Sequence, residues 1–138
     1  MIQRVQSLWL AGAALSCFLS FRLPFFSGTK LESGLSTPAQ LDGGSNFFIL
    51  IFTIVLFGLS LVTIFYFKNR KLQLKLAAGG IALSILLVVL YFSQIKNFET
   101  GSVTLWCIFT LAIPFCFIMA ARGIWKDEKL VKSLDRLR

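Results

Sequence analysis

Twenty-one consecutive residues without a charged side chain, Phe47 to Phe67, constrain this chain more than any other feature. A helix of that length extends for about 31 Å, at 1.5 Å per residue, which matches the hydrocarbon core of a bilayer. Asn46 directly precedes the segment and is suited to cap it, because its side chain can accept a hydrogen bond from a free backbone amide. The segment is therefore predicted to be a transmembrane helix.

Three further apolar segments are predicted to span the membrane. Residues 76–95 and 103–121 contain no charge. Residues 7–26 carry only Arg22, which lies near the end of the segment, so its long side chain can reach the headgroups. Hydrophobic residues make up 57% of the chain, above the roughly 45–50% of ordinary soluble domains. This excess agrees with a chain that lies mostly in lipid.

The remaining segments are predicted to connect the spans. Residues 27–45 are rich in Gly and Ser and show neither helical nor strand periodicity, so a polar outer loop is expected there. Residues 68–75 are predicted to form a tight, basic inner turn, and residues 96–102 a short outer loop. The expected fold is an all-α integral membrane protein with a single membrane domain. Four transmembrane helices form a bundle, and residues 122–138 follow as a charged cytoplasmic tail.

The distribution of basic residues predicts the orientation of the spans. If the N-terminus is cytoplasmic, eleven of the fourteen Lys and Arg lie on the cytoplasmic side, and Arg22, Lys30 and Lys96 lie on the other. The positive-inside rule then places both termini in the cytoplasm. Three acidic residues balance the outer side, so the inner side carries the whole net charge of +8. Topology thus accounts for the basic balance, and nucleic-acid binding is not expected.

The spans carry little that catalysis uses. They contain no Asp, Glu, Lys or His, and the chain has no histidine at all. Metal sites and Ser–His or Cys–His nucleophilic systems are therefore not expected in their usual forms. The prediction is a protein without cofactor, metal or enzymatic activity. An enzymatic alternative requires the outer carboxylates to converge, Glu32 with Asp42 or Glu99.

The three cysteines, Cys17, Cys107 and Cys116, lie inside apolar segments and are predicted to pack as small apolar residues. Cys107 and Cys116 are nine residues apart on one expected helix, roughly 13 Å, which is too far for a disulfide. An alternative interpretation of the N-terminus is a lipoprotein signal with Cys17 as the acylated residue. The apolar stretch that follows Cys17 fits poorly with the polar tether of a lipoprotein.

Small residues recur every four positions on two of the expected helices. Gly12, Ser16 and Ser20 do so on the first, and Ala78 with Ala82 and Gly80 with Ser84 do so on the third. Such stripes let helix backbones approach closely in a membrane. They predict contacts inside the bundle, or alternatively contacts with another membrane protein.

The tail is predicted to form an amphipathic cytoplasmic helix. Three leucines recur at helical spacing, three basic residues fall on the opposite face, and Glu128 is placed to pair with Lys132 four residues later. Three interpretations remain open: the tail associates with lipid and fixes topology, packs on the basic turn and Arg4, or docks on a partner. The candidate contact residues for lipid or a partner are Arg4, Arg70, Lys71, Lys129, Leu130, Lys132, Leu134, Arg136 and Leu137.

The two ends of the chain carry a family resemblance. "MIQRVQ" at the start and "KDEKLVKSLDRLR" at the end resemble the signatures of a family of small four-span proteins from Bacteroidota, domain of unknown function 4293. The resemblance implies an integral protein of the bacterial inner membrane and adds no catalytic residues. It marks both ends of the chain as the distinctive surfaces.

The expected function is a non-enzymatic accessory or scaffolding subunit of a larger inner-membrane assembly. Its partners are the lipid bilayer and other membrane proteins, contacted through the tail or the small-residue faces. The alternative is a small transporter or channel component. That alternative needs a polar path, for which the spans offer only Ser, Thr and Gln94.

Overall fold

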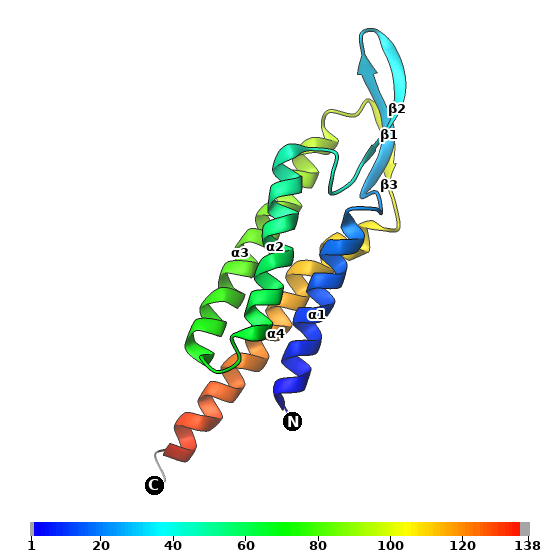
Figure 1. The fold of residues 1–138 in the computed structure, drawn as a ribbon. Helices are drawn as coiled ribbons and strands as arrows, with labels where there is room; N and C mark the ends of the chain where they lie inside the picture. Colours follow the sequence, from blue (N-terminus) through cyan, green and yellow to red (C-terminus); the bar gives the residue numbers. More distant parts are fainter. Residues whose placement is uncertain (1, 136–138) are drawn as a thin grey trace.

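Within the described residues, the chain folds into four helices and a small antiparallel sheet, seen in a computed structural model (Figure 1). The structure describes the backbone of residues 2–135 and the side chains of residues 5–134. The helices are α1 (Ile2–Ser20), α2 (Phe47–Phe65), α3 (Arg70–Ile95) and α4 (Cys107–Asp135). The strands are β1 (Phe26–Glu32), β2 (Leu35–Leu41) and β3 (Thr100–Val103).

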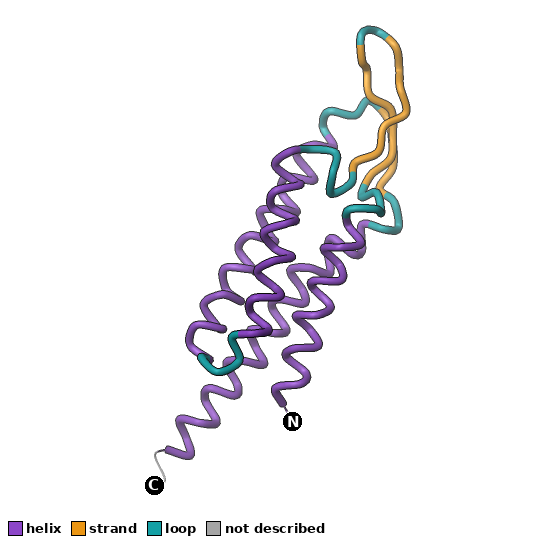
Figure 2. Tube along the Cα trace, viewed as in Figure 1, coloured by secondary structure: helices purple, strands orange, loops and turns teal. Residues whose placement is uncertain are grey.

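The helices form a bundle in which successive helices run in opposite directions (Figure 1). α1 packs against α2 and α4, and α3 packs against the same two helices. The start of α1, the turn between α2 and α3 and the end of α4 therefore lie at one end, and the sheet lies at the other (Figure 2). We call the first the basic end, because its described basic residues are Lys68, Arg70, Lys71, Lys75, Arg122, Lys126, Lys129 and Lys132. The opposite end is the sheet end.

The outer surface of the bundle is apolar. Large apolar side chains are exposed on every helix, for example Leu8, Phe48, Val89 and Phe115. A soluble protein would bury many of these side chains, whereas lipid solvates them. α2, α3 and α4 are each long and apolar enough to cross a membrane, and Val5–Ser20 of α1 forms a shorter apolar helix. The fold is therefore suited to a membrane.

The interior of the bundle combines apolar residues with hydroxyl groups. Thr53, Thr63 and Ser84 are buried, and their hydroxyls donate to backbone carbonyls of their own helices at 2.6–2.8 Å. These bonds satisfy the hydroxyls without a partner on another helix, so the helices can pack closely around them. The expected N-cap is also present, since the Phe48 amide donates to Asn46 Oδ1 at 3.1 Å.

Two of the small-residue stripes lie inside the bundle, as predicted. A Cβ added at Gly12 would lie 3.6 Å from Cys116 Sγ, and a Cβ added at Gly80 would overlap the ring of Phe117. Both contacts join α4 to a neighbouring helix. Ala78 and Ala82 are instead exposed on α3, so this pair does not serve internal packing.

The prediction of an all-α chain with an irregular loop over residues 27–45 is wrong. β1 and β2 form a hairpin whose turn holds Ser33 and Gly34 with positive φ, at 56° and 82°. β3 pairs with the other edge of β1, giving the strand order β2-β1-β3. The reason is that strands in an exposed ribbon need backbone pairing but no apolar alternation, so no periodic signal appears in the sequence.

Three expected boundaries also change. α1 ends at Ser20, although the first span was expected to reach residue 26. α3 begins at Arg70, so most of the predicted 68–75 turn is helical. The fourth span and the described part of the tail form one continuous helix, Cys107–Asp135, which contains Pro114. Hydropathy marks where a helix stops being apolar, and polar helical residues extend both α3 and α4 beyond that point.

Candidate functional site

The basic end contains a hollow of about 520 Å³ between the α2–α3 turn and the flank of α4. We call it the basic hollow. The turn contributes a cluster of long basic side chains, and α4 contributes one face of its charged part. Its lining residues are Lys68, Asn69, Arg70, Lys71, Glu128, Val131 and Lys132.

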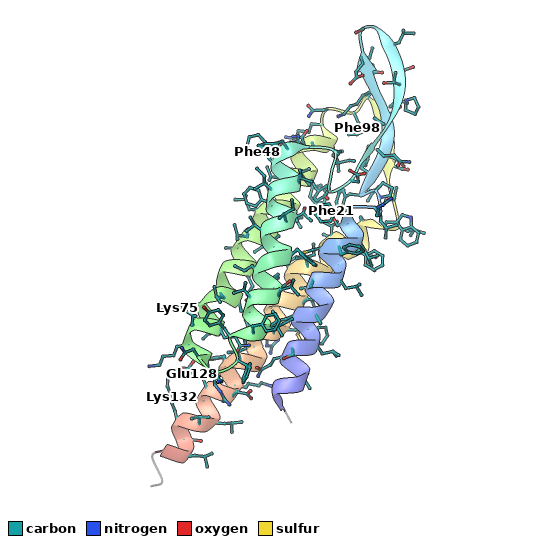
Figure 3. The ribbon with its side chains drawn as sticks, in the orientation of Figure 1. Phe21, Phe48, Lys75, Phe98, Glu128 and Lys132 are labelled. Atoms are coloured by element: carbon teal, nitrogen blue, oxygen red, sulfur yellow. The ribbon has the colours of Figure 1, made fainter. Side chains whose placement is uncertain are left out.

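Positive charge dominates the basic hollow, because four basic side chains line it against one carboxylate. Lys132 Nζ lies 2.9 Å from Glu128 Oε1, which confirms the predicted pair four residues apart (Figure 3). The hydrogen bond from Lys132, aided by the charge of Lys71, holds the pKa of the Glu128 carboxyl below its ordinary value. Glu128 is therefore ionised at neutral pH, and the hollow keeps an excess of three positive charges.

The α2–α3 connection holds the basic residues in a fixed place. Gln73 is buried, and its Nε2 donates to the Thr63 carbonyl at 3.1 Å, which ties the first turn of α3 to the last turn of α2. The Asn69 amide donates to the Tyr66 carbonyl at 3.3 Å and closes the turn between them. The backbone of Arg70 and Lys71 thus belongs to a helix end that hydrogen bonds fix to α2, rather than to a free loop.

A second feature of the basic end joins α1 to α4. Gln6 Nε2 donates to Asp127 Oδ2 at 2.5 Å, and both side chains are buried. Gly123 makes room for this contact, because a Cβ there would lie 2.8 Å from Gln6 Cγ. The groove beside it, about 280 Å³, is lined by Val5, Gln6, Trp9, Met119, Arg122, Gly123 and Lys126.

The charged part of α4 leaves its apolar stripe uncovered. Leu130 is 53% exposed and Leu134 is 67% exposed. Lys129 and Leu130 line a shallow hollow of about 330 Å³ together with Lys126 and Ser133. α4 therefore presents different faces to the basic hollow, to α1 and to the surroundings.

The structure brings together some of the predicted contact residues and separates others. Arg70, Lys71 and Lys132 meet in the basic hollow, whereas Lys129 and Leu130 lie at the shallow hollow and Leu134 lies farther along α4. The side chain of Arg4, and Arg136 and Leu137, lie outside the described residues. Sequence reasoning missed Lys68, Glu128, Gln6 and Asp127 as site residues. Lys68 belongs to the same "KNRK" cluster as Arg70 and Lys71, which is the signal that could have found it.

The comparison with protein families covers nearly the whole chain. The model of a domain of unknown function, DUF4293, matches residues 2–137. The chain belongs to the DUF4293 family. The match includes both ends that carry the resemblance, and in this DUF4293 protein the described parts of those ends meet at the Gln6–Asp127 contact. No curated protein and no solved structure matches the chain.

Two of the outer carboxylates of the DUF4293 protein, Glu32 and Asp42, do not converge. Glu32 lies at the tip of the β1–β2 hairpin, and Asp42 follows its base, so the length of the hairpin, roughly 20 Å, separates them. Asp42 Oδ1 accepts a hydrogen bond from the Gly44 amide at 2.9 Å. Glu99 is held beside β1, where its amide donates to the Thr29 carbonyl. Among the described side chains, no group of three or more Cys, Asp or Glu is placed to hold a metal ion.

The cysteines of the DUF4293 protein pack in the bundle. Cys17 and Cys116 belong to the buried core, and Cys107 is half-buried. In the described part of the chain all three are free thiols. The expectation that they act as packing residues is therefore confirmed. Cys17 lies fully buried within α1, beside α4, rather than in an accessible position.

Proposed function

We propose that this protein is a non-enzymatic accessory or scaffolding subunit of a larger assembly in the bacterial inner membrane. All four helices span the membrane in this proposal, and both termini lie in the cytoplasm. The observation that carries it is the uncovered leucine stripe on the part of α4 that projects beyond the bundle (Figure 1).

The stripe is suited to a protein partner. Leu130 and Leu134 lie on a continuous helix, and the basic residues Lys129 and Lys132 border them. Covering apolar surface is favourable by about 25 cal/mol per Å². A helix with an apolar face and basic borders fits a groove that is apolar at its centre and acidic at its rim. We therefore assign the stripe to a cytoplasmic groove of that chemistry on a neighbouring membrane protein.

The charge distribution supports the proposed topology. Eight described basic residues gather at the basic end, while Arg22, Lys30 and Lys96 belong to the sheet end. The positive-inside rule assigns the basic end to the cytoplasm. α1 joins this arrangement as the fourth span because it packs along both α2 and α4. Reporter fusions after Arg138 and between Ser33 and Gly34 test it, since they are expected to report opposite sides.

The interior favours a packed scaffold over a transport path. Thr53, Thr63 and Ser84 direct their hydroxyls to their own helices. Gln94 lies near the end of α3 and accepts a hydrogen bond from Asn97 Nδ2 at 2.9 Å, so it belongs to the sheet end. Movement of a solute by the purified protein in liposomes would instead establish the transporter alternative.

The test of the accessory role compares two double variants in native membranes. Leu130→Ala with Leu134→Ala removes the stripe, and Val131→Ala with Ser133→Ala changes exposed residues of the same helix while leaving the stripe and its basic borders intact. Chemical crosslinking followed by mass spectrometry is expected to find one neighbour at fixed stoichiometry in the wild type and the control. The leucine variant is expected to lose that neighbour. Recovery of the wild type only as an uncrosslinked monomer contradicts the proposal.

Point variants serve this test better than removal of the tail. Asp127 is buried against Gln6, so a truncation that starts there also breaks the contact between α1 and α4. The two double variants leave that contact intact and alter only residues that lie farther along α4.

A further inference from the structure

We infer that the basic hollow binds the phosphate group of an anionic phospholipid in the membrane leaflet at the basic end. The ligand class is a glycerophospholipid with a net negative headgroup, such as phosphatidylglycerol. The inference does not depend on the protein partner of the leucine stripe, because neither Leu130 nor Leu134 lines the basic hollow. Lys132 borders both surfaces, and the variants below leave it unchanged.

The chemistry of the hollow suits a phosphate. Lys68, Arg70 and Lys71 come from one turn, and Lys132 faces them from α4. Arginine can hold two phosphate oxygens with its planar fork, and lysines supply point charges around the remaining oxygens. Glu128 offsets only one of the four positive charges, and it does so through its pair with Lys132. The three residues of the turn therefore retain their charge for a ligand.

The position of the hollow suits a lipid rather than a free phosphate. Exposed apolar side chains directly precede and follow the basic cluster: Phe65 at 75%, Phe67 at 52% and Leu72 at 40%. A molecule with a phosphate at one end and acyl chains at the other can contact both surfaces at once. Inorganic phosphate can use only the charged one. The hollow is therefore expected to bind a phospholipid more tightly than inorganic phosphate.

The volume and the support of the hollow agree with this assignment. About 520 Å³ is available, within the range of small-ligand sites. The Gln73–Thr63 hydrogen bond fixes the α2–α3 turn, and α4 packs along α3 on the other side. The backbone that carries the basic side chains is therefore fixed on both sides of the hollow, and this distinguishes the hollow from a diffuse basic surface.

The experiment measures lipid adducts by native mass spectrometry of the full-length protein released from detergent micelles. The probes are phosphatidylglycerol and phosphatidylcholine, which share a phosphate and acyl chains but differ in net charge. One bound phosphatidylglycerol is expected, with clear preference over phosphatidylcholine. The double variant Lys68→Ala with Lys71→Ala is expected to weaken phosphatidylglycerol binding about tenfold.

A second double variant separates a defined site from general attraction. Lys75→Ala with Lys129→Ala removes the same charge at the same end, but neither residue lines the basic hollow. Its phosphatidylglycerol binding is expected to stay within about twofold of the wild type. Equal losses in the two double variants, or no preference for phosphatidylglycerol, would overturn the inference.

A competition experiment and a folding control complete the test. Displacement of phosphatidylglycerol by millimolar inorganic phosphate would assign the hollow to a soluble anion and overturn the lipid assignment. Thermal unfolding checks that each variant is folded, which is expected because Lys68 and Lys71 are exposed. If the double variant unfolds, the single variant Lys71→Glu replaces it, and undiminished lipid binding in that variant contradicts the inference equally.

Discussion

The side-chain amide of Gln6 donates a hydrogen bond to the carboxylate of Asp127, and the two residues are 121 positions apart in the sequence. The contact joins the first turns of α1 to the charged part of α4, where both side chains are buried. The charged part of α4 is therefore fixed to the bundle at its start.

Replacing Gln6 with Leu is expected to destabilise the protein by about 1–3 kcal/mol, because it removes the hydrogen-bond donor that the structure describes for the buried Asp127 carboxylate. Chemical or thermal unfolding in detergent, followed by circular dichroism, measures the loss. Gln40→Leu is the matched control, since Gln40 is exposed in β2. The double variant Gln6→Leu with Asp127→Leu is expected to recover part of the loss, because both polar groups are gone. A stable Gln6→Leu single variant would show that the contact contributes little.

Two adjacent glycines in α3 are expected to respond oppositely to alanine. A Cβ at Gly80 overlaps the Phe117 ring, whereas a Cβ at Gly79 meets nothing within 4 Å. Gly80→Ala is expected to destabilise the protein by about 1–3 kcal/mol through overpacking. Gly79→Ala is expected to stabilise it by up to about 1 kcal/mol through helix propensity. Thermal shift of the two purified variants measures the difference, and equal shifts would place the α3–α4 contact elsewhere.

Gly101→Val is expected to detach β3 from β1. A Cβ at Gly101 would lie 2.6 Å from the Ser27 carbonyl oxygen, and the opposite residue in the register is Gly28. The strand pair thus has no space for a side chain here. Limited trypsin digestion in nanodiscs is expected to cleave faster after Lys96, which precedes β3. Gly44→Val is the control, because its nearest neighbour lies at 3.6 Å, and comparable digestion of the two variants would contradict the pairing.

Cysteine labelling is expected to distinguish the two ends of the bundle. Leu35→Cys places a thiol at the exposed hairpin tip, and Ser133→Cys places one near the end of α4. In intact cells without their outer membrane, a membrane-impermeant maleimide is expected to label the first and not the second. The wild type supplies the background, since Cys17 and Cys116 are buried. Labelling of Ser133→Cys alone would reverse the proposed orientation.

The apolar helices were predictable because length and hydropathy suffice for them. Phe47–Phe65 lies within the predicted second span, and its cap at Asn46 was visible from the sequence. The helix ends were less predictable. Four of the six residues from Arg70 to Lys75 are polar, yet the segment is helical. A hydropathy pattern does not distinguish a polar loop from the polar first turn of a helix. The sequence did predict that the basic segments lie at one end of the bundle, because successive helices run in opposite directions.

The sheet was not predictable, because its strands lack a buried face. Most residues of β2 are exposed, and Pro38 lies inside it. β1 is stabilised on its second edge by β3, more than 65 residues later in the chain. Pairing of this kind depends on the helices bringing both segments to one end of the bundle, and a local pattern contains no trace of it.

The basic residues of the candidate site could be predicted from the sequence, whereas its buried polar pair could not. Arg70, Lys71 and Lys132 are conspicuous charges, and they do share a hollow. Gln6 and Asp127 were hidden, since an acidic residue in a charged segment normally faces water. Only the packing of α1 on α4 buries them.

α4 is one helix from the sheet end to the basic end, so a bend near its start displaces its far end. Pro114 removes one backbone donor near its first third, where a helix bends most readily. From there to Leu134 the helix runs for about 30 Å, so a tilt of about 10° displaces the leucine stripe by roughly 5 Å. A small change in the angle of α4 at Pro114 would therefore move the stripe farther than any part of the helix nearer to the proline.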